Sequence, residues 1–296
     1  DGIRDVAVTG VQTCALPILS RVVAAMTDPN PRVAGQGFTQ LRQAGVEVSV
    51  GECEEAARRL NEAFSRYITT GRPLVTLKTA MTLDGKIAAP DDNSGWITSE
   101  AARAHVQQLR HAHDAICTGI GTVLADDPLL TDRSGQSRRR PLLRIVMDSH
   151  LRLPLTAKLL GKVQDDLLVV CSASADPDKR RALENRGAEV YATPNSANDD
   201  ARADLHAVLD ELGKRQMTSV MIEAGAALNG AAVEAGIVDK LFFYYAPKLL
   251  GGDDALPALG GRGIRAMRDA LDVRHIRHHH FGDNLDRKST RLNSSH

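Results

Sequence analysis

The sequence predicts an α/β fold in which a mostly parallel β-sheet carries helices on both faces. Short apolar segments alternate with amphipathic segments along most of the chain, which is the pattern of strands alternating with helices. Several short segments are apolar without interruption, such as LLRIVM, LLVVC and SVMI. A strand has this composition when helices cover both faces of a parallel sheet. Ligands of such sheets bind at the carboxyl ends of the strands, where we therefore look for a site.

The main domain is expected to begin after a break at 69–73, TTGRP. Its strands are expected at 74–82, 115–119, 142–149, 167–172, 189–192, 220–224 and 241–247. Its helices are expected at 99–112, 178–186, 200–216 and 227–235. Upstream, a strand at 21–26, a helix at 36–45 and a strand at 46–50 precede a helix at 53–67, which has Ala56, Leu60, Ala63, Phe64 and Tyr67 on one face.

Both ends of the chain lack a sustained pattern. Residues 1–18 meet a well-patterned strand abruptly, and the polar segment 287–296 follows a strand that ends early at Leu285. We interpret 1–18 and 286–296 as a non-native leader and tail and exclude them from the fold. Ordinary disordered termini are the alternative. The expected domains are then an N-terminal fragment, 19–70, and the main domain, 71–285.

Composition excludes several classes of function. Lys plus Arg and Asp plus Glu number 37 each, so no global charge attracts the chain to nucleic acid or an anionic membrane. Aromatic residues make up only 3%, which disfavours base stacking. The four cysteines are dispersed, as in a protein of the reducing cytoplasm. No apolar run is long enough to span a bilayer.

The segment 219–232, SVMIEAGAALNGAA, joins a buried strand to a helix through small residues. Small side chains let a dinucleotide pyrophosphate approach the backbone, and the free N–H groups of a helix start favour its charge. Glu223 would lie at the end of the strand as an acceptor for a sugar hydroxyl. Because the spacing is not GxGxxG, close packing of helix on sheet, with Glu223 as a surface acid, explains the segment equally well.

Two further segments carry candidate residues. In CTGIGTVLADDP (117–128), two glycines imply a tight backbone, and the paired acids could tune one another for acid–base chemistry. A solvated turn at Asp-Asp-Pro is the commoner outcome. The segment 79–96 ends in the only tryptophan, Trp96, which either packs in a loop or excludes water beside a nicotinamide.

Basic residues and histidines complete the set of candidates. Arg110 or Arg133 could hold a phosphate through a bidentate pair, and Ser149 with Arg152 could hold the 2′-phosphate that distinguishes NADPH from NADH. A solvated charge is the simpler reading of any one arginine. Consecutive histidines at 278–280 in a strand point to alternating faces, so we expect no metal site.

Six segments in this order resemble the bifunctional riboflavin-biosynthesis proteins, in which a zinc deaminase domain precedes a reductase domain of dihydrofolate-reductase-like fold. They are GRPLVTLKTAMTLDGKIA, SGWITSEAAR, LRHAHDAICTGIGTVLADDPLLT, RIVMDSHLR, VMIEAGAALNGA and YAPKLLGG. The likeness covers nearly all of 71–285, and 21–48 resembles the last part of the cytidine-deaminase-like α/β domain. That deaminase needs an H-x-E motif, and no histidine precedes His105, so we expect no deamination and no zinc site here.

The resemblance implies specific contacts and a homodimer. NADPH contacts would fall on Ala80, Trp96, Thr122, Asp126, Ser149, Gly225, Ala226, Ala227, Leu228, Asn229, Gly230 and Ala231. Substrate contacts would fall on Ser94, Arg110, Leu130, Arg133 and Glu223. Asp126 is our candidate for polarising the substrate or relaying a proton.

The implied reaction is the NADPH-dependent reduction of 5-amino-6-(5-phosphoribosylamino)uracil to 5-amino-6-(5-phosphoribitylamino)uracil. Two alternatives stay open: another dihydrofolate-reductase-like reductase of a pterin or pyrimidine, which would ignore the phosphate, and a non-catalytic remnant that binds nucleotide without turnover. An intact zinc deaminase is the alternative we favour least.

Overall fold

The computed structural model describes residues 19–91, 97–194, 202–281 and 284–290. The chain forms two compact units, Asp1–Arg72 and Pro73–His296. Each unit has its own core, and each is described by itself.

The first unit has a small two-stranded sheet covered on one face by a helix. Strands β1 (Arg21–Ala24) and β2 (Glu47–Val50) pair in parallel, and α1 (Gln36–Gln43) connects them. Phe38 and Leu41 of the helix are buried against the strands. Val23, which points the other way, is exposed, and so is Val50 at the end of β2.

One predicted helix of this unit is in fact two. The periodicity predicts a single helix over 53–67, whereas α2 (Glu54–Leu60) and α3 (Glu62–Thr70) meet at Asn61. The side chain of Asn61 donates to the carbonyl of Ala57, a local bond that competes with regular helix. Leu60, predicted to share the apolar face of a single helix, is 86% exposed.

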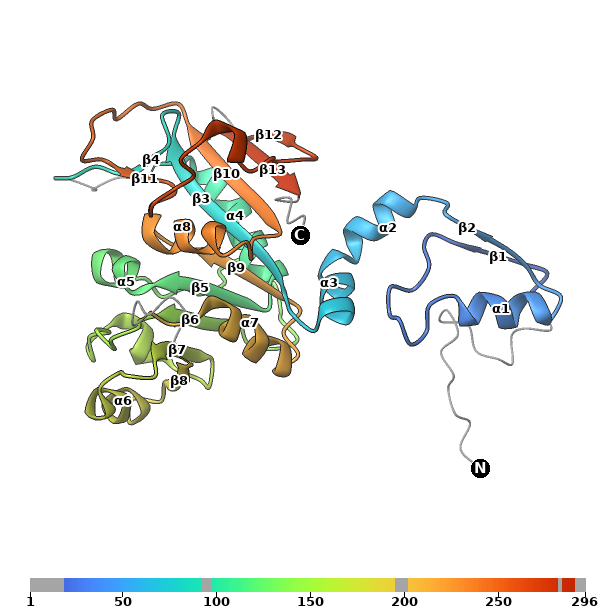
Figure 1. The fold of residues 1–296 in the computed structure, drawn as a ribbon, viewed down its shortest axis with the longest axis horizontal. Coiled ribbons are helices and arrows are strands. Elements are labelled where there is room, and N and C mark those ends of the chain that lie inside the picture. The colour runs from blue at the N-terminus through green and yellow to red at the C-terminus, as the bar shows by residue number, and fades with distance from the viewer. Residues whose placement is uncertain (1–18, 92–96, 195–201, 282–283, 291–296) are drawn as a thin grey trace. The chain divides into compact units, whose positions relative to one another are not determined.

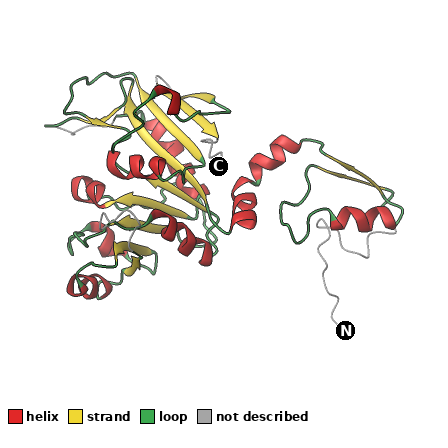
Figure 2. Ribbon diagram, in the orientation of Figure 1, coloured by secondary structure: helices red, strands yellow, loops and turns green. Residues whose placement is uncertain are grey.

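The second unit is built on one nine-stranded sheet in the order β12-β13-β10-β3-β9-β5-β6-β7-β8, shown in Figures 1 and 2. The strands are β3 (Leu74–Thr82), β5 (Ala115–Gly119), β6 (Leu143–Met147), β7 (Leu167–Ser172), β8 (Glu189–Thr193), β9 (Ser219–Glu223), β10 (Lys240–Ala246), β12 (Arg277–Phe281) and β13 (Asn284–Thr290). The seven strands from β10 to β8 in this order are all parallel, and β13 runs antiparallel to both β10 and β12. The predicted mostly parallel sheet is confirmed.

Helices cover both faces of this sheet, as predicted. They are α4 (Glu100–Ala112), α5 (Ile120–Asp126), α6 (Pro177–Glu184), α7 (Leu205–Lys214) and α8 (Ala226–Glu234), with short 3-10 turns at Lys158–Lys162 and Met267–Asp269. Helices α7 and α8 pack on the face that carries Val75 and Leu77 of β3. Helix α4 packs on the opposite face, against Phe242 and Tyr244 of β10.

Two expectations need correction. The glycine-containing segment after β5 is a helix rather than a tight loop, because Ile120 and Val123 bury one side of α5, which outweighs the cost of Gly121 in a helix. The strand predicted to end at Leu285 continues to Thr290 as β13. Residues 240–245 of β10 pair with it, so part of the segment that we excluded as a tail belongs to the sheet.

Candidate functional site

A half-buried acid lies between two cations on the α4 face of the sheet. Lys78 on β3 and Glu223 at the end of β9 are register partners, so their side chains share a face. Lys78 Nζ donates to Glu223 Oε1 at 2.9 Å. From α4, the Nε and Nη2 atoms of Arg110 lie 3.0 and 2.9 Å from Glu223 Oε2. Both carboxylate oxygens of Glu223 therefore have a cationic partner.

The two cations decide the protonation state of this acid. Burial alone would raise the pKa of Glu223, but the charges and hydrogen bonds of Lys78 and Arg110 outweigh it and lower the pKa to about 2. At neutral pH the group is a carboxylate. It can accept hydrogen bonds from hydroxyl groups, and it has no proton to give.

Lys78 is the residue of this cluster that sequence reasoning missed. It lies inside the strand segment LVTLKTAMT, where a single lysine predicts an outward-facing position. Only the register of β3 against β9 shows that it faces Glu223. The cation also lies 5.9 Å from the centroid of the Tyr244 ring, whose hydroxyl is 2.7 Å from Nδ1 of His105 on α4. Ala80, a predicted cofactor contact, pairs with Tyr244 on the same face.

Two residues after Glu223, the chain enters α8 at a glycine that contacts α5. Gly225 is the extended N-cap of this helix, and its N–H donates to Thr122 Oγ1 of α5 at 3.1 Å. A β-carbon at Gly119 would lie 3.6 Å from Leu228. The starts of α5 and α8 are thereby held together, and Thr122 and Gly225, both predicted cofactor contacts, touch each other.

Of the predicted cofactor contacts from Gly225 to Ala231, only Gly225 precedes the helix. Ala226 to Ala231 form the first turns of α8. Asn229 is fully buried and donates to the carbonyls of Ala224 and Ala258. A β-carbon at Gly230 would lie 1.9 Å from the carbonyl oxygen of Gly260. These last two positions have a packing role, and the backbone N–H groups at the start of α8 are the part suited to a phosphate.

The remaining predicted contacts lie in different environments. Ser149 Oγ accepts the N–H of Ala203 at 3.0 Å, which leaves its proton to donate. Asp126 is the exposed last residue of α5. Leu130 has a left-handed backbone (φ 53°) and a side chain 3% exposed in the core, so only its backbone could contact a substrate.

Arg133 is exposed, and its N–H donates to Gln107 of α4 at 2.9 Å. Ser94 and Trp96 lie outside the described residues. The site residues that the structure brings together are therefore Arg110 with Glu223, and Thr122 with Gly225.

The family model of the RibD C-terminal domain matches residues 73–285. The riboflavin biosynthesis protein RibD of Actinobacillus pleuropneumoniae is 42% identical over 86% of this chain and 67% of its own length. The solved structure of Acinetobacter baumannii RibD (form 1) superimposes with a TM-score of 0.78 at 34% identity, over 92% of this chain and 72% of that chain.

The chain belongs to the RibD family. A third relative is a Thermotoga maritima protein described as a diaminohydroxyphosphoribosylaminopyrimidine deaminase/5-amino-6-(5-phosphoribosylamino)uracil reductase. Its structure gives a TM-score of 0.70 at 28% identity, covering 94% of this chain and 73% of that chain. The chain spans about two thirds of the length of the curated RibD relatives. The dihydrofolate-reductase-like architecture expected for its second unit agrees with these RibD structures.

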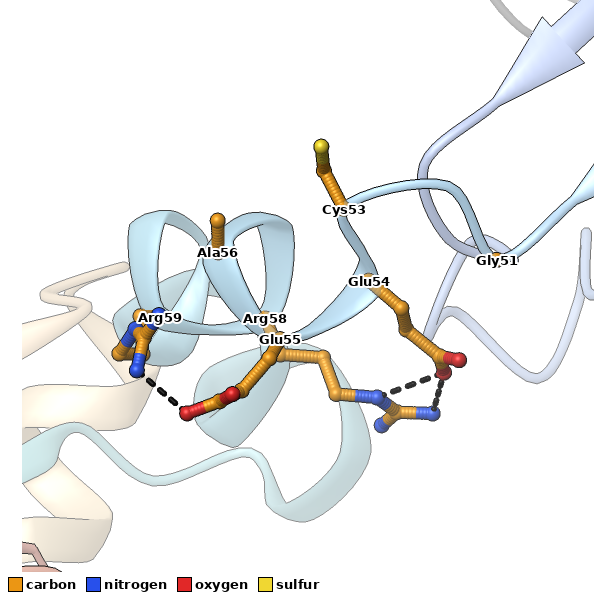
Figure 3. Close-up of a pocket in the computed structure, with 7 residues that line it drawn as sticks. All are labelled: Gly51, Cys53, Glu54, Glu55, Ala56, Arg58 and Arg59. Atoms are coloured by element: carbon orange, nitrogen blue, oxygen red, sulfur yellow. Dashed lines mark hydrogen bonds and ion pairs between the residues drawn. The ribbon is translucent and has the colours of Figure 1, made fainter.

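A surface hollow in the first unit of this RibD-family chain, shown in Figure 3, does not resemble a site. It is lined by Gly51, Cys53, Glu54, Glu55, Ala56, Arg58 and Arg59, all from α2 and the turn before it. Its two arginines pair with Glu54 and Glu55 of their own helix. These charges satisfy one another, and an exposed pair of this kind needs no ligand to explain it.

Within the described ranges, no three or more His, Cys, Asp or Glu side chains gather as metal ligands. Histidines 278–280 lie exposed on β12. In the same part of the chain, no helix combines the length and apolarity that crossing a membrane requires.

Proposed function

We propose that the second unit reduces 5-amino-6-(5-phosphoribosylamino)uracil to 5-amino-6-(5-phosphoribitylamino)uracil, with NADPH as the reductant. RibD-family membership makes the chain an oxidoreductase of riboflavin biosynthesis. The cofactor and the roles of individual residues are the parts that we propose.

One observation carries the proposal: an ionised acid and a helix start suited to phosphate stand two residues apart. Glu223 is fixed by Lys78 and Arg110, and Gly225 leads into α8. A polyhydroxylated sugar bound at Glu223 would therefore lie beside a dinucleotide whose phosphates meet the α8 backbone. Such an arrangement aligns donor and acceptor, which is the protein's main contribution to hydride transfer.

The residues present fit NADPH. The N–H groups at the start of α8 suit the pyrophosphate, and the Ser149 hydroxyl can donate to the 2′-phosphate. When bound, the nucleotide would supply the hydride that reduces C1′ of the opened sugar. The chain's own residues would orient that carbon and exclude water from it.

The proton that completes the reduction needs a donor other than Glu223. Asp126 remains our candidate, and Lys78 joins it because its ammonium group is held 2.9 Å from Glu223 at the mouth of β9. Comparing turnover of Asp126→Asn and Lys78→Gln at saturating NADPH separates them. The variant that binds NADPH normally but loses about 10²-fold or more in turnover identifies the donor.

The proposed reaction is tested by following loss of NADPH absorbance with the phosphoribosylamino-uracil substrate and identifying the ribitylamino product. Glu223→Gln should abolish most turnover, whereas the surface control Glu184→Gln should not. Equal activity on the substrate without its phosphate would favour a different pterin or pyrimidine reductase. NADPH binding without oxidation would favour a non-catalytic remnant.

We also propose that the chain forms a homodimer in the cytoplasm. Eight large apolar side chains between Leu249 and Ile276 are exposed, among them Leu249 at 75% and Met267 at 89%. Apolar side chains left exposed along one segment are suited to burial in an interface, and a second copy of the chain is the partner we propose for them. Light scattering should show a dimer that Met267→Glu weakens and Leu155→Glu, at an exposed site elsewhere, does not. A monomer at micromolar concentration would contradict it.

A further inference from the structure

Arg138, in the connection between α5 and β6, binds the end of helix α4. Its Nη1 atom donates to the carbonyl oxygens of Arg110 and His111 at 3.0 and 2.9 Å. Its Nη2 atom donates to the carbonyl of His113 at 2.6 Å. The last carbonyls of a helix lack partners within the helix, and a cation is favourable at that end of its dipole. Arg138 thus caps the helix that carries Arg110.

The same guanidinium also holds the segment that carries Arg133. Arg138 Nη1 lies 3.1 Å from Oδ2 of Asp132, and His111 Nδ1 of α4 lies 2.8 Å from that oxygen. Asp132 is only 7% exposed and Arg138 only 16%. A charged contact this far removed from water is more rigid than a surface ion pair.

Two other bonds join this segment to α4. The carbonyl of Thr131 accepts a hydrogen bond from Nη1 of Arg110 at 2.9 Å. The backbone N–H of Arg133 donates to Oε1 of Gln107 at 2.9 Å. These hydrogen bonds therefore fix Arg110 and Arg133 relative to each other. Arg138 is the cation at the centre of this set of bonds.

We propose that Arg138 is a positioning residue for the phosphorylated end of the substrate, acting through Arg110 and Arg133. The inference rests on the proposed function. It goes beyond it because Arg138 holds the backbone and side chains that set the spacing between the two predicted substrate arginines. None of its hydrogen bonds involves Thr122, Ser149 or α8, so its loss should spare the cofactor.

Arg138→Met, with its exposed neighbour Arg139→Met as the matched control, tests this assignment. For each protein the KM for substrate, the KM for NADPH and the ratio of kcat/KM with and without the substrate phosphate are measured. Arg138→Met should raise the substrate KM about tenfold or more and reduce the preference for the phosphate. The NADPH KM should stay within about twofold. Arg139→Met should match the unchanged protein.

Arg138→Lys should be intermediate, because an ammonium group cannot reproduce the planar fork that reaches three carbonyls and Asp132. If Arg138→Met does not fold, Arg138→Lys measured in the same way decides. Unchanged phosphate preference, or equal rises of both KM values, would overturn the positioning role and leave Arg138 a general support of the fold. If the unchanged protein itself shows no phosphate preference, the proposed substrate is wrong, and that result is visible before any variant is made.

Discussion

Glu223 is an anion kept ionised by its neighbours, which gives a pH-dependent contribution to stability. Its pKa is lowered from 4.5 to about 2 in the folded chain. A group with a lowered folded pKa contributes stability that is fully present above the unfolded pKa and is lost as pH falls toward the folded one. For Glu223 this window runs from about pH 4.5 down to about pH 2.

The free energy of unfolding of Glu223→Gln should therefore fall less across that pH window than that of the unchanged protein. At neutral pH the variant should be less stable by about 3 kcal/mol, because Lys78 and Arg110 lose their counter-charge. Urea titrations at several pH values measure both effects, with Glu184→Gln as the surface control. Parallel stability curves for the two proteins would show that Glu223 is not the titrating group.

Gly230 faces backbone that cannot move aside cheaply. A β-carbon there would overlap the carbonyl oxygen of Gly260 at 1.9 Å, so Gly230→Ala should destabilise the fold by about 2 kcal/mol or more. The matched control is Gly121→Ala in α5, where nothing lies within 4 Å of the added carbon. That variant should gain up to about 1 kcal/mol from helix propensity. Equal urea midpoints for the two variants would disprove the close approach.

At the level of elements, the sequence predicts the interior of the sheet well. Strands β3, β5 and β7 have the predicted bounds, because continuous apolar runs between turn residues leave few other interpretations. Helix α5 was missed because Gly119 and Gly121 suggest a loop, and only the burial of Ile120 shows otherwise. The boundary between α2 and α3 depends on a single local bond of Asn61.

Helix α4 carries Arg110, and its first turn is capped by Ser99. Ser99 Oγ accepts the N–H of Ala102 at 3.3 Å. Ser99 Oγ also donates to the carbonyl of Phe281 at 3.2 Å, so the rescuing variant must keep a hydroxyl. Ser99→Ala should lower the free energy of unfolding by about 1 kcal/mol, and Ser99→Thr should retain most of it. Denaturant titration of both variants decides: if Ser99→Thr falls as far as Ser99→Ala, the hydroxyl is not acting as a cap.

At the scale of the whole molecule, β13 completes the sheet beyond the point where the sequence pattern ends. Its residues 286–290 pair with 240–244 of β10. A chain that stops after Leu285 exposes that edge, so it should aggregate more readily and unfold at lower denaturant than one that stops after Thr290. Sedimentation and urea titration compare the two lengths. Indistinguishable behaviour would mean that β13 adds nothing to stability.

The sequence pattern could not predict the order of the strands in the sheet, and it therefore could not predict the cluster around Glu223. The apolar runs predict which segments are strands but not which strands are neighbours. Lys78 could be recognised only once β9 was known to lie between β3 and β5. By contrast, Glu223 and Gly225 are adjacent in sequence, so local reasoning was able to select both as candidates.

The central place of β9 has a consequence for synthesis on the ribosome. Strands β3 and β5 emerge early but do not pair with each other, and β9, which pairs with both, begins 100 residues after β5 ends. A nascent chain released only as far as α7 has Lys78 and Arg110 without their counter-ion, and both halves of its interior remain open to solvent. Translation must therefore pass residue 223 before the central sheet can form. A pause before that point would leave an incomplete sheet, which chaperones would have to shield.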